Sequence, residues 1–220
     1  MSLHEKAAMF EEAELLRGFE FTPWPKTPRL FRDVVVTEKL DGTNAAIHIK
    51  ENKDLPGTFS IAAQSRRRLI TPGRSYDNFG FAGWVHENAA ELIHILGPGV
   101  HFGEWWGKGI QRGYGMERRV FSVFNVERWY ETGADGLDSM STRAELSAIA
   151  EQIAAVPILY RGPLSEPEIM RTLRLLKTHG SSAAPNFMNP EGVCVYHSAS
   201  RQVFKVTLDA NDAAKWESAA

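Results

Sequence analysis

The sequence contains a single cysteine, Cys194, among its 220 residues. One thiol excludes an internal disulfide and a cysteine-rich zinc site, so a reducing compartment fits best and we expect a cytoplasmic protein. No apolar run is long enough to cross a membrane. The N-terminal stretch also lacks the basic start and the unbroken apolar segment of a signal peptide. We therefore expect neither membrane insertion nor secretion.

The chain also lacks a basic excess, since its formal net charge is −2. The protein as a whole therefore offers no attractive field to nucleic acid, and such binding would need a local basic patch. Two basic segments occur, and each taken alone is more typical of a solvated charged face. They comprise Arg66, Arg67, Arg68 and Arg74 in the first segment, and Lys108, Arg112, Arg118 and Arg119 in the second.

Several common catalytic motifs are missing. The stretch "GEWWGKGIQRGYG" at 103–115 is rich in glycine, but it has no G-K-[ST] and its glycines miss the G-x-G-x-x-G spacing. The seven histidines include no H-x-x-x-H pair, which leaves zinc hydrolysis and a phosphodiesterase-like histidine pair without support. There is no nucleophile elbow either.

What is present is an ordinary globular composition, 43% hydrophobic and 24% charged. The first segment reads as an amphipathic helix that ends at Gly18, followed by a proline-rich extended stretch. Strand-like runs predict strands at 33–39, 44–50 and 59–64, with Asp41 and Gly42 turning the first into the second as a hairpin. A helix is predicted over 84–97, and strands follow at about 100–105 and 120–128.

Capping boxes predict two later helices, which begin near Thr142 and Ser165, and Gly180 closes the second. Strands at about 192–197 and 202–207 precede a short polar tail around Trp216. We find no repeat or clear linker, so the sequence predicts a single α+β domain over 1–220, with antiparallel sheets and helices at their edges.

Lys39 is the most unusual residue of the predicted strands. Strand alternation puts Val35, Thr37 and Lys39 on one face, so the lysine points into whatever that face lines. A lysine held partly out of water is a potential nucleophile, because only the neutral amine carries a lone pair for attack. Alternatively, Lys39 pairs with Asp41 or Glu38 at a strand end in water.

Five short motifs accompany Lys39 in order: "KLDGTN" at 39–44, "FGEWWG" at 102–107, "FSVFNV" at 121–126, "EGVCVY" at 191–196 and "FKVTL" at 204–208. This set resembles the covalent nucleotidyltransferases, which include ATP-dependent DNA and RNA ligases and mRNA-capping guanylyltransferases. Asn44 and the lead-in "PKTPRL" at 25–30 make the phage-type, nick-sealing RNA ligases the most similar branch. The resemblance implies an ATP-grasp-like adenylation core.

The resemblance implies that Lys39 attacks the α-phosphate of ATP, expels pyrophosphate and holds AMP in a phosphoramide bond. It assigns Glu104 to the ribose hydroxyls and Phe124 to the adenine face. It assigns Glu191 to a divalent metal, expected to be Mg²⁺, and Lys205 to the α-phosphate. These residue types suit those tasks, because carboxylates accept hydroxyl hydrogen bonds, aromatic rings cover bases and cations neutralise phosphate charge.

The remaining nucleotide-binding candidates are Glu38 beside the lysine, Asn44 near the sugar or the incoming end, and Arg66 in the run "SRRR". Each candidate also has an ordinary structural interpretation. Glu104 could pair with Lys108, Phe124 could lie in the core, and Glu191 could be a turn residue before a strand.

Two features depart from the family. Thr207 stands where many ligases carry a second lysine, and only 15 residues follow Lys205, so we expect a catalytic core with no appended C-terminal domain. The function indicated is an ATP-dependent RNA ligase that joins RNA 3′-hydroxyl and 5′-phosphate ends, and a nicked duplex or an RNA/DNA hybrid could be its substrate. The alternatives are a DNA nick ligase, a capping-type nucleotidyltransferase, or a catalytically inactive RNA-binding module. The sequence does not predict an oligomeric state.

Overall fold

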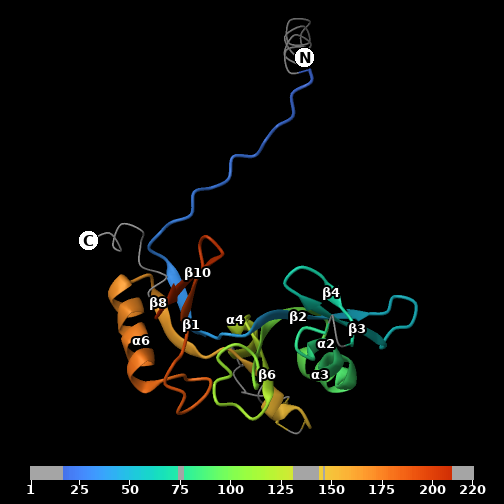
Figure 1. Ribbon diagram of the computed structural model, residues 1–220. Coiled ribbons are helices and arrows are strands. Elements are labelled where there is room, and N and C mark those ends of the chain that lie inside the picture. The colour runs from blue at the N-terminus through green and yellow to red at the C-terminus, as the bar shows by residue number, and fades with distance from the viewer. Residues whose placement is uncertain (1–16, 74–76, 131–143, 146, 210–220) are drawn as a thin grey trace, which may run out of the picture.

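The structure is a computed structural model that describes residues 17–73, 77–130, 144–145 and 147–209. The predicted N-terminal helix, the predicted helix start at Thr142 and the tail around Trp216 lie outside these residues. The described chain forms two β-sheets that lie side by side with helices packed on them (Figure 1). The predicted α+β class is confirmed. No described helix is long and apolar enough to cross a membrane.

The first sheet has four antiparallel strands. Their order is β10 (Gln202–Thr207), β9 (Gly192–His197), β1 (Asp33–Lys39) and β8 (Ile158–Pro163). The long helix α6 (Glu166–His179) covers one face of it, where Val34 and Val36 pack against Leu173 and Leu176. Val35 points to the opposite face, toward the second sheet. The alternation predicted for this strand is therefore confirmed, and one face of β1 is left for a site.

The second sheet has six strands, and only its β6–β7 pair is parallel. Their order is β4 (Leu69–Ile70), β3 (Phe59–Ser65), β2 (Thr43–Glu51), β5 (Gly99–Gly107), β6 (Arg119–Val123) and β7 (Ile153–Ala155). Helices α2 (Phe81–Glu87) and α3 (Ala89–Leu96) bury an aromatic cluster against it, in which Trp84 and Trp105 lie 4.9 Å apart between ring centroids. This packing fixes β5, the strand that carries Glu104.

The predicted hairpin at Asp41 and Gly42 is wrong. β1 pairs with β8 and β9, β2 pairs with β3 and β5, and the two residues carry the chain from one sheet to the other (Figure 1). The close approach of the chain to β5 explains this, because a Cβ added at Gly42 would lie 2.4 Å from the Trp105 carbonyl oxygen. Glycine is required at position 42 because a side chain there would collide with β5. The segment at Asp41 and Gly42 is a crossover between the two sheets.

Two element boundaries also differ from the prediction. The helix expected over 84–97 is two helices that meet at Asn88, and Gly97 ends the second by donating its N–H to the Ile93 carbonyl. The strand expected to reach 128 ends at Val123, where the short helix α4 (Val126–Tyr130) follows. The Asn125 side chain accepts the Arg128 N–H and so caps the start of that helix.

Strands β4, β7 and β8 were not predicted, since the first two are only two and three residues long and β8 is a half-exposed edge strand that contains glycine and proline. A short 3-10 turn, η1 (Ala150–Gln152), leads into β7. Helix α6 confirms the prediction from Ser165 to Gly180, although the Ser165 side chain makes no capping hydrogen bond. The Glu168 carboxylate instead pairs with Arg171 at 2.9 Å.

Candidate active site

A pocket of about 960 Å³ lies between the two sheets. Strands β1, β9 and β10 form one wall, and β2, β5 and the loop after β6 form the other. Seven of the eight predicted site residues line this pocket, and the eighth, Glu191, is bonded to one of them. The seven are Glu38, Lys39, Asn44, Arg66, Glu104, Phe124 and Lys205.

The register of the first sheet explains why two lysines share the pocket. Thr37 pairs with Cys194, and Cys194 pairs with Lys205, so these three residues stand in one row across the sheet. Lys39 stands one row further along, beside Gly192. Residues in register or two apart on neighbouring strands face the same side. Residues from three segments distant in sequence therefore converge on one surface.

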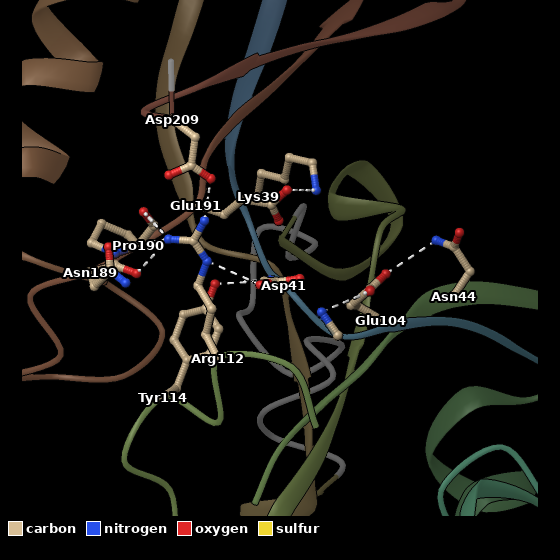
Figure 2. Close-up of polar contacts among 11 residues, drawn as sticks. Lys39, Asp41, Asn44, Glu104, Arg112, Tyr114, Asn189, Pro190, Glu191 and Asp209 are labelled. Carbon is tan, nitrogen blue, oxygen red and sulfur yellow. Dashed lines mark hydrogen bonds and ion pairs between the residues drawn. The ribbon is translucent and has the colours of Figure 1, made fainter. Parts of the chain in front are cut away.

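The Lys39 amine makes an ion pair with Glu191, with Nζ 2.6 Å from Oε1 (Figure 2). The lysine side chain is 23% exposed and the glutamate side chain 16%. The expected alternative partners are engaged elsewhere, since Asp41 pairs with Arg112 and Glu38 binds a neighbouring loop. The lysine lines the pocket, and its ion pair is with Glu191 and not with Asp41 or Glu38.

Glu104 is buried against the crossover between the sheets. Its Oε1 accepts the Gly42 N–H at 3.1 Å and its Oε2 accepts the Asn44 amide at 3.2 Å (Figure 2). Burial raises the pKa of Glu104 to about 7, and the positive charge of Lys39 opposes this rise. The carboxylate therefore ties the chain after Lys39 to β5. The suggested pairing with Lys108 does not occur, because Lys108 pairs with Glu117.

Phe124 and Arg66 lie on the second-sheet side of the pocket. Phe124 is 44% exposed, whereas its neighbours Phe121 and Val123 are buried, so Phe124 is not a core residue. Its backbone is fixed by a hydrogen bond from its N–H to the Phe102 carbonyl. Arg66 directly follows β3 and is exposed. A ring and a guanidinium are thus available to a ligand in the pocket.

Glu38 lies on the pocket wall, but its carboxylate is already used. Only 1% of the residue is exposed, and its oxygens accept hydrogen bonds from the Ser181 hydroxyl and from the N–H groups of Ser182 and Ala183. Burial raises its pKa, and these hydrogen bonds oppose the rise. The contacts tie the loop after α6 to β1, directly beside Lys39.

The second oxygen of Glu191 has the character of a metal ligand. Its Oε2 atom is buried and has no hydrogen-bond partner among the described residues. A buried unpaired carboxylate oxygen is costly, and a hard cation such as Mg²⁺ prefers such oxygens. Among the described residues, no group of three or more His, Cys, Asp and Glu side chains could hold a metal ion. Glu191 could therefore provide one ligand to a bound cation.

The loop between β5 and β6 also supports the site, although no sequence motif predicts this role. Tyr114 is buried there, and its hydroxyl accepts the Asp41 N–H at 2.9 Å. Burial raises the pKa of Tyr114, so its hydroxyl stays neutral. Arg112 from the same loop contacts Asp41 and two further segments (Figure 2). No local motif marks either residue, because their partners are more than 70 positions away in sequence.

The second basic segment is not a free basic patch. Arg118 pairs with Glu151, and Arg119 donates to main-chain carbonyl oxygens, including that of Phe79 at 2.6 Å. In the first segment, Arg66 and Arg67 are exposed, and Arg74 lies outside the described residues. Among the described residues of the two segments, only Arg66 lines the pocket.

The two sheets with a lysine-bearing pocket between them match the nucleotidyltransferase fold of RNA ligases. A comparison with protein families matches the RNA ligase family over residues 32–207, and the chain belongs to this family. The match ends at Thr207, the last residue of β10, and includes all eight predicted site residues. A comparison with curated proteins finds no match.

Solved structures of an RNA ligase from Naegleria gruberi share the fold. A lysine-to-alanine mutant without ligand is 18% identical with a TM-score of 0.50, and it matches over 80% of this chain and 49% of its own. A second lysine-to-alanine mutant, with ATP and Mn, is 17% identical with a TM-score of 0.50 over 80% and 49%. A glutamate-to-alanine mutant with ATP and Mn is 17% identical with a TM-score of 0.51 over 81% and 50%. The present chain thus spans about half the length of these structures.

Proposed function

We propose that this protein is an ATP-dependent RNA ligase that forms a lysyl-AMP intermediate on Lys39. The observation that carries the proposal is the Lys39 amine, held in a pocket between two sheets at 2.6 Å from the Glu191 carboxylate. Family membership supports it. Residues 17–209 would act as one adenylylating domain.

In the first step, the Lys39 nitrogen attacks the α-phosphorus of ATP. A nitrogen–phosphorus bond forms, the bond from the α-phosphorus to the bridging oxygen breaks, and pyrophosphate leaves. The lysine must lose a proton before it attacks, and Glu191 Oε1 is within reach to accept it. Lys205, in the adjacent row of the same sheet face, supplies positive charge for the phosphate oxygens.

The other wall of the pocket would hold the nucleoside. The exposed ring of Phe124 would stack on adenine, an interaction that depends on an accessible ring face. Glu104 would accept hydrogen bonds from the ribose hydroxyls, since each of its oxygens has capacity beyond its contact with Gly42 or Asn44. Asn44 and Arg66 would contact the sugar and the phosphates from the same side.

Glu191 would also provide a ligand to Mg²⁺ through its unpaired Oε2. Magnesium commonly takes one or two carboxylates together with phosphate oxygens, so one protein ligand here is sufficient. The cation, when bound, neutralises charge on the phosphates during displacement. The structures of the Naegleria gruberi enzyme with ATP and Mn support a divalent metal in this family.

In the second and third steps, AMP would pass to the 5′-phosphate of RNA, and a 3′-hydroxyl would then displace it. The substrate would be RNA ends held in a nicked duplex or an RNA/DNA hybrid. Arg66 lines the pocket on the β3 side and is exposed, so it suits a phosphate contact, and Arg67 beside it is also exposed. The DNA nick ligase and the capping-type enzyme remain the alternatives.

The test uses ATP labelled on either the α- or the γ-phosphate, followed by matched nicked duplexes with RNA or DNA at each terminus. We expect covalent transfer of the α-label but not of the γ-label, and sealing that requires RNA at the 3′-hydroxyl side. Exclusive sealing of a DNA 3′-hydroxyl would favour the DNA ligase instead. Binding of RNA with no transfer of the α-label would indicate a non-catalytic module.

A further inference from the structure

Arg112 makes an unusual set of contacts from the loop between β5 and β6 (Figure 2). Its Nε donates to Asp41 Oδ2 at 3.0 Å. Its Nη1 donates to the Asn189 carbonyl at 3.1 Å, to the Asn189 side chain at 3.2 Å and to the Pro190 carbonyl at 3.3 Å. Its Nη2 donates to Asp209. One guanidinium therefore binds three separate segments of the chain.

These three segments carry, or lead directly to, three charged residues of the proposed chemistry, which are Lys39, Glu191 and Lys205. Asp41 lies two residues after Lys39, and Pro190 directly precedes Glu191. Asp209 follows β10, the strand that carries Lys205. The last two segments are also joined directly, because the Leu208 N–H donates to the Glu191 carbonyl. Arg112 thus lies where the ends of β1, β9 and β10 meet.

The contacts require an arginine. The guanidinium is planar, always charged and presents donors in fixed directions, whereas a lysine ammonium is a single point charge. The Arg112 side chain is only 16% exposed, and it forms ion pairs with two carboxylates, those of Asp41 and Asp209. It is not among the residues that line the pocket.

We infer that Arg112 is a positioning residue for adenylylation, which clasps the Lys39, Glu191 and Lys205 segments in the arrangement that the reaction needs. The inference rests on the proposed function. The Nζ to Oε1 distance of 2.6 Å depends on two turns, and both turns are held by this side chain. Displacing reacting groups by about 1 Å can cost on the order of 100-fold in rate.

The test measures single-turnover formation of the AMP adduct across ATP concentrations. For Arg112→Met we expect the rate constant at saturating ATP to fall by about 10- to 100-fold, and the ATP concentration for half-maximal rate to change less than about threefold. Arg112→Lys keeps the positive charge but loses the planar set of guanidinium donors. Its rate constant should lie between those of the wild type and Arg112→Met. Circular dichroism and thermal melts identify the folded variants.

Two further variants sharpen the result. Asp209→Asn removes one exposed partner, so it should slow the reaction less than Arg112→Met, and the double variant should be no slower than Arg112→Met alone. The Asp209→Asn variant also tests the clasp if Arg112→Met fails to fold. Arg171→Met is the matched control, since Arg171 forms an exposed ion pair with Glu168 on α6, and we expect the wild-type rate.

The outcomes separate the two proposals. If the wild-type protein forms no adduct, the proposed function is wrong, and the inferred role of Arg112 is wrong as well. If the wild-type protein forms the adduct and the folded Arg112 variants match its rate constant, the clasp alone is wrong. A weakened response to ATP at an unchanged rate constant would also overturn the clasp, because it would assign Arg112 to ATP binding.

Discussion

At the scale of single residues, the pocket gathers acidic and basic groups whose charges depend on one another. Glu191 balances Lys39, and Glu104 is buried close enough to Lys39 for that charge to moderate its pKa. Such perturbed groups in a cleft are characteristic of functional sites. The arrangement costs stability, which makes it testable in the absence of any substrate.

The raised pKa of Glu104 predicts a specific pH dependence of stability. Between pH 4.5 and about 7 the native state keeps a proton that the unfolded state has lost. The free energy of unfolding therefore falls over this window by up to ~3 kcal/mol and is level above it. Glu104→Gln should avoid this loss, and its advantage over wild type in urea denaturation should grow from pH 4.5 to 7. A pH-independent difference would contradict the assignment.

The unpaired oxygen of Glu191 leads to a prediction about the metal. Glu191→Gln removes the charge that Lys39 and the cation would share, so adduct formation should fall by about 100-fold and need more Mg²⁺ for its half-maximal rate. The control is Glu117→Gln, which changes an exposed residue paired with Lys108. A wild-type Mg²⁺ titration in the Glu191 variant would assign the metal to other ligands.

At the scale of elements, the strands with clear alternation were predictable and their partners were not. The runs at 33–39, 192–197 and 202–207 follow from local sequence, and their common face brings Lys39 and Lys205 together. The prediction of a hairpin at Gly42 was wrong because Asp-Gly is a common turn signal, whereas the actual path of the chain is set by its contact with β5. Strand pairing is a non-local property, and short-range patterns do not contain it.

The crossover at Gly42 predicts an asymmetry between two glycine substitutions. Gly42→Ala places a methyl group against the Trp105 carbonyl, so we expect a loss of about 1–3 kcal/mol in the free energy of unfolding and slower adduct formation. Gly83→Ala, within α2, meets only ordinary contacts with Asp77 and should stabilise the protein by about 0.5–1 kcal/mol. Chemical denaturation of both variants checks this, and a tolerated Gly42→Ala would contradict the close approach.

At the scale of the whole molecule, the candidate site exists only because residues of both sheets line one pocket. The ordered motifs allowed seven pocket residues to be predicted from sequence. Arg112 was not predicted as part of the site, because its partners Asp41, Asn189 and Asp209 are 71, 77 and 97 positions away. The site residues follow from motif resemblance, while the residues that hold them together depend on the fold.

A ligand bound to both walls should stabilise the whole fold. An ATP analogue with a methylene bridge between its α- and β-phosphates cannot release pyrophosphate, so it reports binding without reaction. At 100 times its dissociation constant it should raise the free energy of unfolding by about 2.7 kcal/mol. Phe124→Ala should leave the melting temperature of the free protein unchanged. It should weaken binding of the analogue by roughly 10-fold or more. Unchanged binding in this variant would show that adenine lies elsewhere.

The most direct test of the account is the location of the covalent adduct. Wild-type protein and Lys39→Arg are incubated with ATP and Mg²⁺, and intact mass and peptide mapping are measured for both. We expect one AMP on wild-type protein, attached at Lys39, and none on Lys39→Arg, because arginine keeps the charge but is effectively never neutral and cannot attack. An undiminished adduct on Lys39→Arg, or AMP mapped to another residue of the wild-type protein, would contradict the account.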